Sequence, residues 1–107
     1  MKLPSGERAI VDIVKVHDYC LNPAHPRGRH KARVFASALG MMAVDAEFLR
    51  EALLCAAREE DATLGEADEY GERYAVDFNL IRRDRQAVFR STWIIRRTEL
   101  VRAVAAG

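Results

Sequence analysis

The hydrophobic periodicity changes partway along this chain, and that change constrains the fold more than any other feature. Up to about residue 57 the apolar residues recur at helical spacing, whereas from Tyr74 onward they alternate with polar or small residues. Alternation places successive side chains on opposite faces of an extended strand. Two alternating runs flank the polar turn Arg82–Arg85 and predict an antiparallel hairpin. In its second strand one face would carry Ala87, Phe89, Ser91, Trp93 and Ile95, and the other Val88, Arg90, Thr92 and Ile94.

The first half of the chain predicts three helices. Residues 9–21 fit a short extended entry and then a helix of about two turns, which Asn22-Pro23 ends. Residues 22–28 form a stiff loop, and a second helix covers residues 29–39 with Gly40 as its C-terminal stop. A third helix begins at Asp45, a candidate N-cap, with a stripe formed by Phe48, Leu49, Ala52, Leu53 and Ala56.

Two segments are harder to assign. Residues 59–73 are acidic and contain Gly65 and Gly71, so they predict a surface loop. Residues 96–107 fit either a further strand or a frayed helix. We therefore expect one α+β domain over residues 1–107, with two or three helices packed on a small antiparallel sheet built around the C-terminal hairpin.

Composition and motifs exclude several classes of function. No apolar run approaches the roughly 18 residues of a membrane span, and the start lacks the apolar segment of a secretory signal, so we expect a cytoplasmic protein without membrane contact. Cys20 and Cys55 lack metal-ligand spacing and are interpreted as reduced core residues. Phosphate-loop, dinucleotide and nucleophile-elbow motifs are absent, so we expect no cofactor and no metal.

The net charge of +1 conceals a strong partition along the chain. Residues 1–44 carry seven Lys/Arg and three Asp/Glu, residues 45–77 carry three and eleven, and residues 78–107 carry seven and two. If the two basic thirds meet in the fold, they would form one basic face opposite an acidic helix and loop. Such a face suits a polyanionic ligand.

The segment from Asn22 to Arg33 is the most informative for function. It contains no acidic residue, and it carries a cluster of basic side chains: His25, Arg27, Arg29, His30, Lys31 and Arg33. A rigid loop that enters a helix presents free N–H groups to phosphate, and His with Lys can supply acid–base cleavage of RNA. In the alternative interpretation these charges only solvate the start of the helix.

A second polar cluster lies in the second strand of the hairpin. Arg90 and Thr92 would complete a phosphate site if they faced the same groove as His30 and Lys31. In the alternative interpretation Arg90 and Thr92 face solvent while Ser91 fills a tight core position.

Three runs of residues resemble a known family. They are Tyr19-Cys20-Leu21-Asn22-Pro23-x-His25-Pro26-x-Gly28-x-His30-Lys31-Ala32-x-Val34-Phe35, Tyr70-Gly71-x-x-Tyr74-x-Val76 and Thr92-Trp93-Ile94-Ile95. Over residues 2–96 the chain resembles an uncharacterised small bacterial domain family, domain of unknown function 6883. The resemblance implies a toxin-type ribonuclease-like α+β fold and an RNA-cleaving or RNA-binding module held in check by a small partner. The residues that it carries over are His25, His30, Lys31, Thr92 and Trp93.

The chain departs from the family pattern in two places. The turn Arg82–Arg85 lacks the glycine that relatives carry, and the sequence after Arg96 differs, so the final strand is either missing or replaced. If that strand completes the active groove, the protein is either inactive or borrows a strand from a second copy of the chain.

Two functional hypotheses follow. The first is a metal-independent ribonuclease or RNA-binding domain of a toxin–antitoxin-like system, with His30, Lys31 and Thr92 catalytic and with phosphate held by His25, Arg27, Arg29, Arg33 and Arg90. The second is a non-catalytic interaction module, antitoxin-like or homodimeric, that pairs through its acidic segment or an edge strand.

Overall fold

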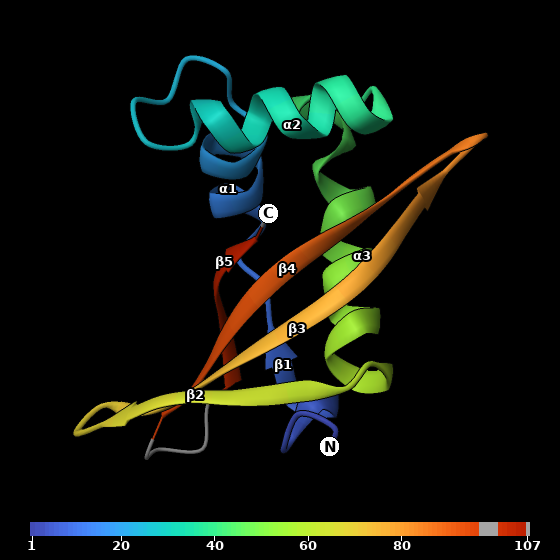
Figure 1. The fold of residues 1–107 in the computed structure, drawn as a ribbon. Coiled ribbons are helices and arrows are strands. Elements are labelled where there is room, and N and C mark those ends of the chain that lie inside the picture. The colour runs from blue at the N-terminus through green and yellow to red at the C-terminus, as the bar shows by residue number, and fades with distance from the viewer. Residues whose placement is uncertain (97–100, 107) are drawn as a thin grey trace.

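The chain folds around a five-stranded sheet with strand order β1-β5-β4-β3-β2, and its helices gather on one side of that sheet (Figure 1). The computed structural model describes residues 1–96 and 101–106. All neighbouring strands are antiparallel except β1 and β5, which run parallel. The α+β class expected from the sequence is confirmed. Strands β2, β3 and β4 form the antiparallel part built around the C-terminal hairpin.

The predicted hairpin consists of β3 (Gly71–Arg82) and β4 (Arg85–Arg96). The two strands pair without a register shift from Gly71↔Arg96 to Arg82↔Arg85. At the turn, Arg83 adopts φ 57°, a left-handed conformation that glycine usually supplies. The hairpin therefore forms without a glycine, and Arg83 adopts the left-handed conformation in its place.

The prediction of a loop over residues 59–73 was wrong. Residues Ala62–Asp68 form β2, which pairs with β3 from Ala62↔Val76 to Asp68↔Gly71 and shifts register between Leu64 and Ala67. Every β2 residue after Ala62 is exposed. Because neither face of the strand is buried, its hydrophobic pattern carries no period-two signal. Backbone pairing at the edge of the sheet defines this strand.

The C-terminal segment contains a strand rather than a frayed helix. β5 (Val101–Ala106) pairs antiparallel with β4 and parallel with the short β1 (Ala9–Ile10). The parallel pair therefore joins strands from the two ends of the described chain. Residues 97–100 and 107 of the predicted tail lie outside the described residues.

The helical boundaries agree closely with the sequence. α1 (Ile13–Lys15) continues into a π-helical turn, η2 (Val16–Cys20), and the side chain of Asp12 caps its start. α2 (Arg29–Leu39) ends at Gly40, whose φ of 65° is the left-handed conformation typical of a helix stop.

The third predicted helix has the expected start but a different cap. α3 (Ala46–Glu59) follows Asp45 directly, and the short turns η1 (Gly6–Arg8) and η3 (Ala43–Asp45) precede β1 and α3. The Asp45 carboxylate makes no cap bond to α3. It accepts instead from the Met42 N–H and from the Arg82 guanidinium, both at 2.9 Å. Asp45 therefore ties the helix start to the hairpin.

The core lies between the helices and one face of the hairpin. Phe35 of α2 stacks on Phe89 of β4 with ring centroids 4.5 Å apart. Trp93 is fully buried and donates its Nε1–H to the Ser91 hydroxyl, which donates in turn to the Val76 carbonyl, both at 2.9 Å. Ser91 thus fills a tight core position with its polar atom satisfied.

The two cysteines differ in burial, so one expectation was wrong. Cys20 is buried, whereas Cys55 is exposed on α3. The Cys55 thiol donates to the Glu59 carboxylate at 3.4 Å, and this bond, followed by desolvation, raises the pKa of the thiol. Phe48, placed on the apolar stripe of α3, is also 40% exposed. Both residues border a groove described below.

Candidate nucleic-acid interface

The loop before α2 is held by His25, one of the predicted phosphate ligands. Its Nδ1 accepts backbone N–H bonds from Arg27 and Gly28, each at 3.0 Å. An accepting Nδ1 is unprotonated, so the ring carries its proton on Nε2. His25 therefore satisfies free N–H groups just before the first turn of α2, in place of a conventional cap side chain. Its role in the structure is to shape the loop.

Tyr19 links this loop to the lysine of the predicted catalytic pair. The Tyr19 ring packs edge-on against His25, with centroids 4.8 Å apart, and the Lys31 ammonium lies 5.2 Å from its centre. A cation over an aromatic face is stabilised by the ring quadrupole. Lys31 is consequently directed toward η2, and the three side chains form one cluster. Only the family resemblance singled out Tyr19 in the sequence.

Four basic side chains remain exposed around the start of α2; we call them the basic patch, formed by Arg27, Arg29, His30 and Arg33. Within residues 1–96 none of them makes an ion pair. The first turn of α2 contains no acidic residue, although the helix dipole favours one there. Residues three and four apart are neighbours on a helix, so His30 and Arg29 both lie near Arg33. The patch is therefore a concentrated positive charge without a partner in the described chain.

An apolar hollow of 340 Å³ adjoins the basic patch. Arg33 is the charged residue of its lining, which consists of Leu21, Pro23, Ala32, Arg33, Ala36, Met41, Met42, Ala43 and Val44. The hollow therefore combines an apolar wall with one guanidinium at its rim. Such a lining suits a flat, weakly polar group attached to an anion.

Arg90 and Thr92 do not join this site, contrary to the functional interpretation. They alternate with Phe89, Ser91 and Trp93 along β4, and α2 packs on the face of Phe89. The period of two therefore places Arg90 and Thr92 on the face of the sheet opposite α2. Arg90 also pairs with Asp77 across the strands, at 2.8 Å and 3.1 Å.

The basic face expected from the sequence is interrupted by ion pairs. The two basic thirds do meet, since α2 packs on β4 and β1 pairs with β5. However, Arg82 is bonded to Asp45 and Arg90 to Asp77, which neutralises both arginines locally. Around the start of α2, the described arginines without an ion pair all lie in the basic patch, while Lys31 lies against the Tyr19 ring.

We expect Arg90→Gln to raise the pKa of the Asp77 carboxyl toward its ordinary value. The hydrogen bond from Arg90 lowers that pKa in the folded protein. A lowered folded pKa stabilises the fold above the unfolded pKa of about 3.9, and this contribution is lost as the pH falls through the folded value. NMR titration of the carboxyl carbon measures the shift. The control Arg73→Gln should raise the pKa of Asp68, which Arg73 lowers, and leave Asp77 unchanged.

Fold and site together define a small α+β domain with a cationic loop at the start of a helix. The chain belongs to the family described as domain of unknown function DUF6883, whose model matches residues 2–106. No curated protein and no solved structure matches the chain. The resemblance read from the sequence is thus confirmed, while the toxin-type ribonuclease that it implied stays a prediction.

The described residues were also searched for metal sites and for membrane-spanning helices. They contain no group of three or more His, Cys, Asp or Glu side chains that could hold a metal ion. Among the described helices, none has the length and apolarity to cross a membrane.

Proposed function

We propose that this domain binds RNA, with the basic patch in contact with the phosphate backbone. The observation that carries the proposal is the group of three exposed arginines, Arg27, Arg29 and Arg33, beside the exposed His30, with no ion pair in residues 1–96. Cations at a helix start oppose its dipole, so an anion would relieve an unfavourable local field. Neutralising phosphates releases counterions, which drives nucleic-acid binding at moderate salt.

The apolar hollow beside Arg33 favours a single-stranded segment. An unstacked base is flat and weakly polar, and its phosphate lies within one nucleotide of it. A base in the hollow and its phosphate on Arg33 would use the two features together. We place this activity in the cytoplasm; a small cognate protein partner, as in a toxin–antitoxin-like pair, stays a prediction from the resemblance.

The geometry supports binding better than cleavage. Metal-independent cleavage of RNA needs a proton acceptor, a proton donor and a cation around one phosphate. Lys31 is directed to the Tyr19 ring, His25 shapes the loop, and Thr92 and Arg90 lie on the other side of the sheet. His30 is then the acid–base group left in the basic patch. The ribonuclease hypothesis is kept as an outcome of the experiment below.

We expect replacement of Arg27, Arg29 and Arg33 by Ala to weaken binding of a fluorescent single-stranded RNA about a hundredfold at low salt. Each lost phosphate contact should reduce the slope of log K against log [salt] by about 0.7 for a single strand. Fluorescence anisotropy across a salt series measures both quantities. A matched control, Arg8→Ala with Arg58→Ala and Arg96→Ala, removes the same charge from exposed positions elsewhere.

The outcomes separate the hypotheses. An equal loss in both triple variants would mean that net charge alone attracts RNA, and the proposed site would be wrong. Incubation of the wild type with total RNA in EDTA, beside His30→Ala, tests for cleavage. Cleavage that disappears in His30→Ala would establish a ribonuclease, while binding without cleavage supports the proposal.

A further inference from the structure

Half of β3 has a free edge. β2 pairs with β3 only as far as Val76, opposite Ala62. Residues 77–82 pair with β4 on one side, and no other strand in residues 1–96 and 101–106 pairs with them. The outward N–H and C=O groups of this stretch are therefore available to another strand.

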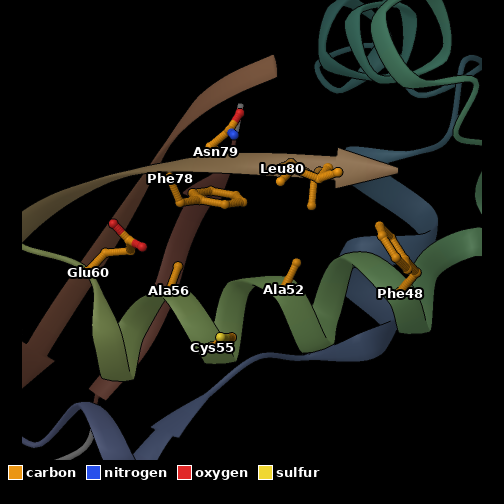
Figure 2. Close-up of a pocket in the computed structure, with 9 residues that line it drawn as sticks. Phe48, Ala52, Cys55, Ala56, Glu60, Phe78, Asn79 and Leu80 are labelled. Atoms are coloured by element: carbon orange, nitrogen blue, oxygen red, sulfur yellow. The ribbon is translucent and has the colours of Figure 1, made fainter. Parts of the chain in front are cut away.

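A groove of 230 Å³ runs between this edge and α3 (Figure 2). Phe78 and Leu80 point from β3 toward the helix, while Asn79 points away from it. The lining is mostly apolar: Phe48, Ala52, Cys55, Ala56, Glu60, Phe78, Asn79, Leu80 and Ile81. An added strand could pair with the β3 backbone and place alternate side chains into this groove.

The edge has little of the usual protection against pairing. Natural edge strands are commonly blocked by proline, by charged side chains, especially lysine, or by a bulge. Residues 77–82 contain no proline and no lysine, and their register with β4 is unbroken. Their two charged residues, Asp77 and Arg82, are both held in ion pairs within the chain. Ile81 is 60% exposed on this stretch. An unprotected edge with an exposed apolar residue is typical of a surface that another chain covers.

The ends of the groove carry opposite charge. Exposed acids lie where α3 leads into β2, namely Glu59, Glu60 and Asp61. The hairpin tip, which projects beyond the helices (Figure 1), exposes Arg83, Asp84 and Arg85 and so has a net positive charge. An antiparallel neighbour of the same kind would place its tip beside these acids. We infer that this groove is an interface with a second copy of the chain, joined β3 to β3 in antiparallel orientation around a two-fold axis.

The dimensions suit such pairing. Six residues of strand span about 20 Å, so the acidic and basic ends of one copy would lie opposite the basic and acidic ends of the other. Each copy contributes the same surface, which makes the contact isologous and closed. The inference is independent of RNA binding, because the basic patch belongs to α2 and the loop before it.

Sedimentation velocity of the full chain from low to high micromolar concentration should show a monomer–dimer equilibrium. Ile81→Lys should weaken the dimer about tenfold or more, since each copy would then carry a lysine in the new strand pair, and lysine is the residue that natural edge strands use to prevent pairing. The control Val88→Lys changes an apolar residue that is 71% exposed on β4, one strand away from the edge, and should leave the equilibrium unchanged. Circular dichroism confirms that both variants are folded.

A charge exchange fixes the orientation. Arg83→Asp and Glu60→Lys should each weaken self-association, and a mixture of the two variants should restore a heterodimer. Alkylation of the exposed Cys55, which lines the groove, should slow as the dimer forms. A protein that is monomeric at every concentration would overturn the inference, as would a dimer that tolerates Ile81→Lys and both charge changes.

Discussion

Gly28→Ala should destabilise the fold by about 2–3 kcal/mol and distort the basic patch. A Cβ on Gly28 would lie 2.0 Å from the Tyr19 carbonyl oxygen, a backbone atom that cannot rotate away. Alanine tolerates the Gly28 φ of −88° and would restrict the unfolded chain, which alone stabilises by about 0.4–1 kcal/mol. The steric clash is the larger effect, so the net change is destabilising. Urea unfolding monitored by Trp93 fluorescence measures it.

Gly65→Ala is the matched control for this prediction. Gly65 lies in the exposed strand β2, and its added Cβ would approach the Arg73 carbonyl oxygen at 3.3 Å, which a small shift of the edge strand relieves. Its stability should change by no more than about 0.5 kcal/mol. If Gly28→Ala were as stable as this control, the close contact between the loop and η2 would not exist in solution. In that case the packing of Lys31 on Tyr19 would also need another explanation.

The elements that bury one face could be predicted from the sequence. The hairpin and α2 follow from apolar periodicity and from Gly40, because burial imposes a regular pattern on each element. β2 could not be predicted, since its residues after Ala62 are exposed and any pattern fits. The short β1 lies in the extended entry that the sequence predicts at the start of residues 9–21, but two residues contain no period that could indicate its pairing with β5.

The candidate site was predictable only in part. The basic patch could be identified because its residues lie within one short segment of the sequence that contains no acidic residue. The link to Arg90 failed because composition does not show which face of a strand meets a helix far away in sequence. The β3 edge was not predictable for a related reason: it exists because β2 begins only opposite Val76 and leaves residues 77–82 without a second neighbouring strand among the described residues.

Arg82→Ala should have the largest effect on stability, about 2–4 kcal/mol. This guanidinium is only 16% exposed and connects the hairpin to two helices. It donates to the Leu39 and Gly40 carbonyls at 3.3 Å and 2.8 Å and to the Asp45 carboxylate at 2.9 Å. The carbonyls belong to the C-terminal end of α2, where a cation also favours the helix dipole. Thermal unfolding should show a clear fall in Tm.

Arg82→Lys separates the geometry of this contact from its charge. A lysine keeps the positive charge but cannot bond two carbonyls and a carboxylate from one planar group. We therefore expect Arg82→Lys to lose most of the stability that Arg82→Ala loses, and Asp45→Asn to lose less, because the bonds to Leu39 and Gly40 remain. Equal stability of Arg82→Lys and the wild type would mean that charge near the α2 terminus is sufficient. The hydrogen bonds from Arg82 to Leu39, Gly40 and Asp45 would then contribute little to stability. The contact of Phe35 with Phe89 would instead hold the hairpin against the helices.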